Sequence, residues 1–292
     1  MRTALYLIIA TALWGLNFHL AKVMLQYSPA MVAGFWRYLF GVIVLLGFSY
    51  KNLPGWSLIK KNIGSLAFAG IIGLFGFNFF FFWGLKYTTA LNAALIVSLN
   101  PALALIFSVV LLKTKISSSQ IAGVILAFVG VLFLITKGNL YRLNQVEFSI
   151  GDFYIFLSNI VFSLYHVWVK KNSGKMETMH FTLITNVMCF LVFLLILPFQ
   201  ELNNFANYSY QFWLAAIGIG AFGTSLAYYL WNKGVGEIGA AQAGIYMNIA
   251  PLSTVLFSLF FGEQLFPYHI ISFMIIVTGL LIMQLKPAVY KR

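Results

Sequence analysis

Long apolar runs separated by short polar connections constrain this chain more than any other feature of its sequence. Of its 292 residues, 61% are hydrophobic and only 8% are charged, whereas soluble domains have about 45–50% apolar and about 25% charged residues. A surface in contact with water would need far more charge. We therefore expect the lipid bilayer to be the solvent of this protein, which excludes a soluble globular domain and, given the 18% aromatic content, a disordered chain.

The apolar runs are long enough to cross a bilayer, which takes about 20 residues of helix. Ten such runs fit between the polar connections, and we expect an all-α integral membrane protein with ten transmembrane helices. No small-residue cleavage pattern follows the first run, so we expect it to be retained as a span rather than removed as a signal peptide. The expected spans are residues 3–23, 30–50, 62–83, 88–111, 118–136, 150–169, 179–199, 210–231, 239–261 and 267–285.

Lysine and arginine lie mostly on one side of these spans. The side that contains the N-terminus has most of the 18 Lys and Arg residues, whereas the other side has only Lys22, Lys86, Lys137 and Arg142. Cytoplasmic connections of membrane proteins have this excess of positive charge, so we expect both termini in the cytoplasm. The net charge of +12 then faces anionic lipid headgroups, and we expect no nucleic-acid binding. The cations of the N-terminal side are Arg2, Lys51, Lys60, Lys61, Lys113, Lys115, Lys170, Lys171, Lys175, Lys233, Lys286, Lys291 and Arg292.

The two halves of the chain resemble each other. Displacing the sequence by 150 positions aligns them without a gap, and we predict two five-helix repeats, residues 1–140 and 141–292, in one bundle. Five is an odd number of spans, so the second repeat enters the membrane inverted. The loop charges are reversed accordingly, since Lys113 and Lys115 follow the fourth span and Glu263 follows the ninth. The aligned pairs are Gly84 with Gly234, Ala90 with Ala240, Ala93 with Ala243, Pro101 with Pro251, and Phe107-Ser108 with Phe257-Ser258.

Proline occupies the middle of the fourth and ninth spans, at Pro101 and Pro251. Proline lacks an N–H, so the carbonyl one turn earlier loses its helical partner. Inverted repeats often place a substrate site where helices are broken at matching positions. We predict that both helices bend at these prolines and that the bends serve gating. Ordinary kinks, with the carbonyls satisfied by neighbouring helices, explain the prolines equally well.

Polar side chains at membrane depth usually face the bundle interior or a transport pathway, because lipid offers them no hydrogen bonds. Positions that are polar in both repeats are the stronger candidates for a pathway. Hydrogen bonds between helices, worth about 0.6 kcal/mol each, are the alternative explanation. The polar pairs are Asn78 with Tyr228, Asn92 with Gln242, and Ser98 with Asn248.

Arg37 is the most informative single residue. It lies about 12 Å along the helix of the second span, where an unpaired guanidinium costs several kcal/mol or more. Either it serves the pathway or it extends toward the outer headgroups, as Lys22 can do more easily. His19 and His166 could carry protons, because histidine titrates near neutral pH, although a neutral, hydrogen-bonded histidine is the commoner finding.

Acidic residues are absent from the depth of the expected spans, since Asp152 and Glu263 lie at span ends and the other acids lie in connections. Exporters of lipophilic cations generally need a buried carboxylate as counter-ion and proton site. The positive sign of Arg37 therefore favours a substrate with a carboxylate or another anionic group. The sequence also has no Walker, HExxH, CxxC or GxSxG pattern and only one cysteine, Cys189, so we expect no enzyme activity, no cofactor and no metal site.

Several short motifs recur in a characteristic order and spacing along the chain. They are Leu13 to Phe18 with Lys22, Ala33 to Arg37, Gly84 to Ala90, Asn100-Pro101, Gly239 to Ala241, Pro251, and Phe261 to Gln264 leading to Gly279. Together they resemble the EamA family of the drug/metabolite transporter (DMT) superfamily over nearly the whole chain. The resemblance implies a ten-helix inverted-repeat bundle in a bacterial inner membrane that moves metabolites such as amino acids, often outward. Family members often have Gly-Glu at the end of the fourth span, where this chain has Leu111 to Lys115, so any role of that glutamate is absent here.

Together these features predict a secondary active transporter that works by alternating access. We expect it to move small metabolites, most of all amino acids or related carboxylate-bearing compounds, as an exporter. A multidrug or cationic-compound efflux transporter is the alternative among transporters, and a channel or a membrane enzyme is the alternative outside them. The candidate substrate-binding residues, from the repeat and from the resemblance, are Trp14, Asn17, His19, Arg37, Asn78, Asn92, Ser98, Asn100, Tyr165, His166, Tyr228, Trp231, Gln242, Tyr246 and Asn248.

The expected partners are a small-molecule substrate, the lipid bilayer and, as a candidate coupling ion, the proton. Small residues in the fifth span, Gly123, Ala127 and Gly130, would permit close approach of a second copy. Packing within the bundle explains these residues equally well, so a monomer and a homodimer both remain open.

Overall fold

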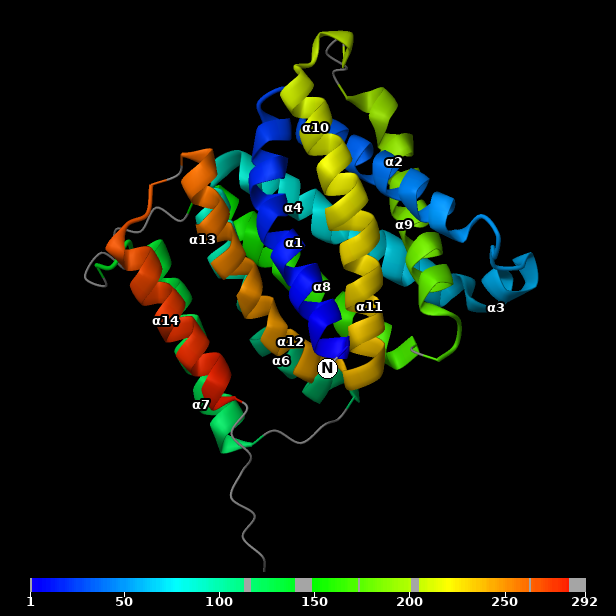
Figure 1. Ribbon diagram of the computed structural model, residues 1–292. Helices are drawn as coiled ribbons and strands as arrows, with labels where there is room; N and C mark the ends of the chain where they lie inside the picture. Colours follow the sequence, from blue (N-terminus) through cyan, green and yellow to red (C-terminus); the bar gives the residue numbers. More distant parts are fainter. Residues whose placement is uncertain are drawn as a thin grey trace, which may run out of the picture.

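The computed structural model in Figure 1 describes residues 2–112, 117–139, 149–172, 174–200, 205–262 and 264–283. All regular secondary structure in these residues is helical, and no strand occurs among them. Seven helical stretches are long and apolar enough to cross a membrane: 2–25, 30–49, 56–87, 90–111, 150–172, 178–199 and 210–238. Three further apolar helices are shorter: 118–134, 249–261 and 267–279. The all-α architecture with long apolar helices agrees with an integral membrane protein.

The helices of the first half follow one another with short connections. Several helix starts have side-chain caps: the Asn92 N–H donates to the Thr89 hydroxyl over 3.0 Å, and Ser117 and Gln120 form a reciprocal capping box. The elements are α1 (Arg2–Leu25), α2 (Ala30–Ser49), α3 (Trp56–Ala67), η1 (Phe68–Phe75), α4 (Gly76–Tyr87), α5 (Ala90–Val97), α6 (Asn100–Leu112) and α7 (Ser118–Ile135).

The helices of the second half have the same order of long, interrupted and short elements. They are α8 (Ile150–Asn172), α9 (Thr178–Ile196), η3 (Leu197–Phe199), η4 (Phe205–Asn207), α10 (Tyr210–Gly218), η5 (Ile219–Leu226), α11 (Ala227–Ile238), α12 (Ala240–Gly244), η6 (Ile245–Asn248), α13 (Ile249–Phe261) and α14 (Pro267–Ile282).

Four of the expected spans differ from uniform helices. The third expected span, residues 62–83, is part of one continuous helical stretch over Trp56–Tyr87, because eight π-helical residues, Phe68–Phe75, join α3 to α4. The fourth is interrupted between Val97 and Asn100, directly before Pro101. The ninth is interrupted by η6 before Pro251, and the eighth has a second π-helical segment, η5, of eight residues.

Helices from the two halves interleave in the centre of the bundle. α1 packs against α13 and α11, while α8 packs against α4 and α6. α2 lies against α9 and η5, and α9 in turn lies against η1. Each π-helical segment therefore packs against a helix from the other half of the chain.

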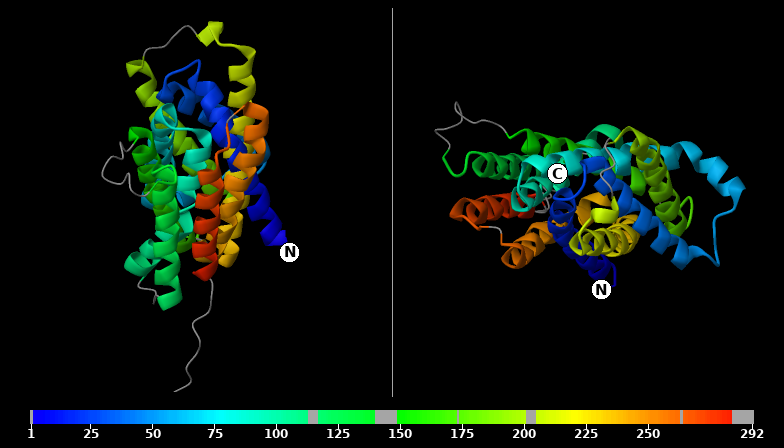
Figure 2. Two further views of the ribbon diagram at one scale, coloured as in Figure 1. Left: turned by 90° about the vertical axis from the view of Figure 1, so that its left-hand side faces the viewer. Right: turned by 90° about the horizontal axis from the view of Figure 1, so that it is seen from above.

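α7 and α14 lie side by side at one edge of the bundle (Figures 1 and 2) and pack mainly against each other. A Cβ atom on Gly123 would collide with the carbonyl oxygen of Gly279, and one on Gly130 would lie 2.6 Å from Cγ1 of Ile276. Small residues allow two helix backbones to approach in lipid. Gly123 and Gly130 therefore serve packing within this chain, against α14.

Candidate functional site

A cavity lies halfway along α1, where helices of both halves converge. Its volume is about 20 Å³, which is room for roughly one water molecule. The centre of the bundle is thus almost closed. The lining residues come from eight elements: Trp14, Asn17 and Phe18 of α1, Arg37 of α2, Phe77 and Phe81 of α4, Val97 of α5, Phe162 of α8, Tyr228 of α11, Met247 of η6 and Ala250 of α13.

Arg37 is the one charged residue of this lining. Its side chain is buried, with 1% of the residue exposed, and its Nε donates to the Thr224 hydroxyl over 2.9 Å. Nη1 is buried without a hydrogen-bond partner, and no Asp or Glu of the described residues forms an ion pair with the guanidinium. Its Cζ lies 5.8 Å from the ring centroid of Phe81. A buried charge without a counter-ion is costly, and an anion placed next to the guanidinium would offset that cost.

The π-helical segment η5 supports three of the cavity side chains. The Gly223 carbonyl accepts a hydrogen bond from Trp14 Nε1 over 3.0 Å. The Asn17 amide lies directly on Gly223, where any Cβ atom would collide with it. Thr224, the next residue, accepts from Arg37. A side chain at position 223 would displace the Asn17 amide, because only glycine lets the amide approach the backbone so closely.

Aromatic rings form most of the remaining wall. Trp14 packs edge-on against Phe162 and Tyr228, with ring centroids 5.3 and 5.4 Å apart, and tilted against Trp231 at 5.1 Å. Phe77 stacks on Phe162 at 4.4 Å. The indole nitrogen of Trp231 and the hydroxyl of Tyr228 are buried without hydrogen-bond partners. An apolar wall with a few unpaired polar groups is typical of a small-molecule site.

A hydrogen-bonded cluster stands behind this wall at the break before Pro101. The Asn100 amide nitrogen donates to Asn159 Oδ1 over 2.9 Å and to the Ser163 hydroxyl over 2.8 Å. Asn100 Oδ1 lies 2.8 Å from His166 Nδ1, and because the oxygen can only accept, Nδ1 of His166 donates. Nε2 of His166 is buried and has no partner. The cluster holds the start of α6 against α8.

A second pocket, of about 380 Å³, opens at the N-terminal end of α1. We call it the N-side pocket; Asn172, Thr178, Lys233 and Glu237 belong to its lining, and Glu237 accepts a hydrogen bond from the Thr3 hydroxyl over 2.5 Å. It is therefore adjacent to the first turn of α1, whereas the cavity lies near residues 14–18.

Three buried side chains form a chain of hydrogen bonds next to the N-side pocket. The Tyr165 hydroxyl donates to Asn232 Oδ1 over 2.9 Å, and Asn232 Nδ2 donates to the Thr182 hydroxyl over 3.0 Å. This chain of hydrogen bonds joins α8, α11 and α9. Asn232 also belongs to the lining of the N-side pocket, so the chain of hydrogen bonds reaches that pocket.

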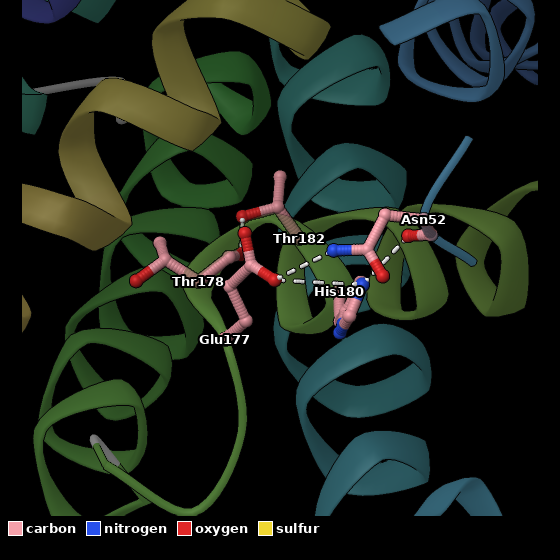
Figure 3. A network of polar contacts seen from close by, with 5 residues as sticks. All are labelled: Asn52, Glu177, Thr178, His180 and Thr182. Carbon is pink, nitrogen blue, oxygen red and sulfur yellow. Dashed lines mark hydrogen bonds and ion pairs between the residues drawn. The ribbon is translucent and has the colours of Figure 1, made fainter. Parts of the chain in front are cut away.

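A polar network below Thr182 fastens the start of α9 to the connection after α2 (Figure 3). His180 Nε2 lies 2.8 Å from the Asn52 carbonyl oxygen and 3.6 Å from Glu177 Oε2. The amide of Asn52 donates to the same carboxylate over 3.4 Å. Because Glu177 is exposed, we expect this network to contribute little to stability and mainly to hold α9 in place.

A third pocket, of about 540 Å³, opens at the other end of α1. We call it the C-side pocket, and His19, Lys22, Gln26, Asn92 and His269 belong to its lining. His19 Nε2 lies 2.9 Å from the Thr254 carbonyl oxygen. The Phe266 N–H donates to His269 Nδ1 over 3.0 Å, so Nε2 of His269 donates to Asn92 Oδ1 at 3.2 Å.

The sequence-derived candidates thus fall into separate groups. His19 and Asn92 lie in the C-side pocket, the Ser98 hydroxyl bonds to its own helix at Leu95, and Tyr246 is half-buried. The side chains of Gln242 and Asn248 lie outside the described residues. Those at the cavity or packed around it are Trp14, Asn17, Arg37, Asn78, Asn100, Tyr165, His166, Tyr228 and Trp231.

Two further candidates are the prolines. Pro101 packs against Gly244, where a Cβ atom would lie 3.2 Å from the proline ring, and Pro251 is buried beside the lining residue Ala250.

Sequence reasoning did not identify the apolar part of the cavity lining or the contacts that η5 makes with the cavity side chains. No group of three or more His, Cys, Asp or Glu side chains that could hold a metal ion occurs in the part of the chain that the structure describes.

The chain is similar in sequence to a family of transporters. The model of the EamA-like transporter family matches residues 1–136 and 149–285. The uncharacterized transporter YyaM of Bacillus subtilis is 33% identical over 272 residues, covering 91% of this chain and 88% of the relative. YetK, an uncharacterized transporter of the same organism, is 27% identical over 286 residues, covering 95% and 85%.

More distant proteins extend this similarity. An uncharacterized transporter of Archaeoglobus fulgidus is 24% identical over 269 residues and covers 89% of both chains. A solved crystal structure superimposes with a TM-score of 0.71 at 21% identity, covering 97% of this chain and 96% of that chain. At this identity the superposition shows a shared fold and no more.

Proposed function

This chain belongs to the EamA-like transporter family, and from that premise we propose that it is a secondary transporter that exports a small carboxylate-bearing metabolite, amino acids first, by alternating access. We infer the substrate class from one observation, the environment of Arg37. Its guanidinium is buried in the central cavity with Nη1 unpaired. A carboxylate would neutralise that charge and accept its free N–H groups.

The arrangement of the pockets supports alternating access. The N-side and C-side pockets lie at opposite ends of α1, next to Thr3 and Gln26 respectively. The closed cavity lies between them, near Trp14 and Asn17. A carrier must pass through a state in which neither side reaches the site. We take this structure to represent such an occluded state, because the cavity is small, and the cavity must enlarge to hold a substrate.

The two-repeat organisation is part of the proposal and rests on three supports. The family model matches two separate segments, 1–136 and 149–285. Helices follow in the same order in both, including a π-helical segment in the middle of the third and of the eighth expected span. Contacts are also exchanged between the halves, since α1 meets α11 and α13 while α8 meets α4 and α6. The resulting layout is ten spans in two inverted repeats.

Gating at the helix breaks fits this layout. Val97, at the end of α5, and Met247, in η6, both line the cavity, and they lie at the interruptions before Pro101 and Pro251. Backbone that is already broken at these points can change direction at low cost. We propose that α5 and α6, and likewise α12 and α13, rotate about these breaks as one pocket opens toward the cavity.

The distribution of positive charge supports an orientation with the N-side pocket in the cytoplasm and both termini on that side. An export cycle then begins when substrate enters past Tyr165, Asn232 and Thr182. Efflux of lipophilic cations is disfavoured, because none of the residues that line the cavity is acidic and Arg37 would repel the substrate.

Counterflow tests the function directly. We would reconstitute the protein in liposomes loaded with one unlabelled carboxylate compound at a time and measure uptake of the labelled compound. We expect saturable counterflow of at least one amino acid, its loss in Arg37→Ala, and unchanged counterflow in Thr185→Val, a buried change away from the cavity. Equal rates for wild type and Arg37→Ala would contradict the site, and counterflow of organic cations alone would contradict the substrate class.

A further inference from the structure

The hydrogen bond to Thr224 determines which edge of Arg37 remains for a ligand. A guanidinium is a planar fork with five N–H donors and can meet a carboxylate in a bidentate way. Nε is already used, because it donates to the Thr224 hydroxyl over 2.9 Å. Nη1 has no partner, and no hydrogen bond to Nη2 is found in the described part of the chain. The edge formed by Nη1 and Nη2 is therefore available to bind a ligand.

The Thr224 hydroxyl is itself held at a fixed place relative to α2, the helix of Arg37. The Ser225 hydroxyl donates to the Gly41 carbonyl over 2.7 Å and to the Gly220 carbonyl over 3.0 Å, which ties η5 to α2. The methyl group of Thr224 fills the space over Gly41, where a Cβ atom would come within 2.7 Å of Thr224 Cγ2. A β-branched side chain wedged in this way has little rotational freedom.

The π-helical form of η5 gives it several contacts with the site at once. Gly220 lies against the Arg37 carbonyl, where a Cβ atom would come within 2.9 Å of it. Gly223 receives both Trp14 and Asn17. Short π-helical stretches occur often at functional sites. This one contacts three cavity side chains: the Gly223 carbonyl meets Trp14, the Thr224 hydroxyl meets Arg37, and the Gly223 backbone meets the Asn17 amide.

We propose that Thr224 is a positioning residue for substrate binding: its hydroxyl, held on η5, anchors Arg37 Nε and so presents the Nη1 and Nη2 edge of the guanidinium to a substrate carboxylate. This inference rests on the proposed function, since it concerns the same site. It adds that a residue 187 positions away in the sequence from Arg37 sets the affinity for substrate without touching it. A carboxylate would then be bound end-on by the guanidinium.

Three variants separate positioning from mere packing. Thr224→Val keeps the shape and removes the acceptor, Thr224→Ser keeps the acceptor, and Thr185→Val makes the same change at another fully buried threonine, whose hydroxyl donates within its own helix. A hydrogen bond to a charged group is worth about 1.5–3 kcal/mol. For counterflow we expect Thr224→Val to raise KM roughly 10-fold or more with the maximal rate nearly unchanged, and the other two variants to stay within about 3-fold.

The outcomes distinguish this inference from the proposed function. If Thr224→Val behaves like Thr185→Val, or if Thr224→Ser fails as badly as Thr224→Val, positioning is wrong. If wild type moves no carboxylate compound, the proposed function fails, and positioning is then judged on the labelling of Arg37 by phenylglyoxal, located by peptide mass spectrometry. We expect Thr224→Val to change that labelling rate by at least about 3-fold and Thr185→Val to leave it unchanged; equal rates in all variants would overturn the inference.

Discussion

The two π-helical segments η5 and η1 both use glycines to pack closely against neighbouring helices. They differ in that η5 contacts the charged side chain of Arg37, through Thr224. In η5, Gly220 faces the Arg37 carbonyl and Gly223 faces the Asn17 amide. In η1, Gly70 faces the Thr185 carbonyl, with a Cβ contact of 2.7 Å, and Gly73 faces the Tyr165 ring, also at 2.7 Å.

Hydrogen bonding separates the two segments more clearly than packing does. On the η1 side the Tyr165 hydroxyl donates to Asn232, and the Thr185 hydroxyl donates to the Phe181 carbonyl. On the η5 side Arg37 keeps unpaired N–H groups, and no hydrogen bond to the Asn17 amide is found within the described residues. The same kind of backbone segment thus packs against paired polar side chains on one side and against an unpaired guanidinium on the other.

The largest expected effect comes from removing the charge of the η5 side. Arg37→Gln keeps a polar side chain but loses the guanidinium fork, and with it two charge-assisted hydrogen bonds of about 1.5–3 kcal/mol each. We expect kcat/KM for carboxylate counterflow to fall by at least about 100-fold.

Arg37→Lys sharpens this comparison, because lysine keeps the charge without the planar fork. We expect it to recover only part of the lost kcat/KM. Full recovery by lysine would show that the sign of the charge suffices and that the geometry of the fork is irrelevant.

The next effect comes from adding one methyl group to each π-helical segment. Gly223→Ala displaces the Asn17 amide, which lies at the end of a flexible side chain, so we expect counterflow to fall roughly 10-fold, the loss of about 1.4 kcal/mol, with little change in thermal stability.

Gly73→Ala pushes against the Tyr165 ring, which is fully buried and in contact with the Phe162 and Tyr228 rings. We therefore expect a lower unfolding temperature and overpacking costs of about 1–3 kcal/mol. Thermal unfolding in detergent and counterflow, measured on both variants, check the contrast. It fails if Gly223→Ala costs more stability than Gly73→Ala.

A smaller effect is expected from weakening the chain of hydrogen bonds formed by Tyr165, Asn232 and Thr182. Tyr165→Phe removes the donor to Asn232 Oδ1, and a buried acceptor left without a partner costs about 1–3 kcal/mol. The occluded state should lose population, and the N-side pocket should reach the cavity more often.

The single cysteine of the chain makes the measurement simple. In a Cys189→Ser background, Val97→Cys, in the lining of the cavity, reports the accessibility of the cavity to a polar maleimide added on the side of the N-side pocket. We expect roughly 5-fold faster labelling with Tyr165→Phe, equivalent to about 1 kcal/mol; an unchanged rate would mean that the hydroxyl does not contribute to closure.

The smallest expected effect is that of Trp14→Phe. It removes the donor to the Gly223 carbonyl but keeps an aromatic ring against Phe162 and Tyr228. A neutral hydrogen bond contributes about 0.5–1.5 kcal/mol, so we expect KM to rise by roughly 2- to 10-fold. A loss as large as that of Arg37→Gln would show that the ring, and not the guanidinium, dominates binding.

The sequence predicts the class of fold and the one charged residue that lines the cavity. Membrane helices are predictable because their length and apolar composition are set by the bilayer. Arg37 is predictable because a charge inside a span is costly unless it has a purpose. The repeat also identified Tyr228, which lines the cavity.

Other features of the site depend on contacts that no local pattern reports. Thr224 and Arg37 are 187 residues apart, and a π-helical segment has no simple sequence signature. Asn92 and Asn100 are close in sequence, but α5 ends at Val97 and α6 begins at Asn100. The Asn92 side chain lines the C-side pocket, whereas the Asn100 amide bonds to Asn159 and Ser163. Phe162 and Phe77 could not be told from lipid-facing phenylalanines by sequence.

The most direct test of the central claim compares a carboxylate substrate with its primary amide in wild type and in Arg37→Gln, by inhibition of counterflow. If the free edge of Arg37 binds a carboxylate, the acid inhibits wild type at least about 30-fold better than the amide, which corresponds to about 2 kcal/mol, and this preference disappears in Arg37→Gln. An acid and an amide that inhibit wild type equally, or a preference that persists without the guanidinium, would contradict the account.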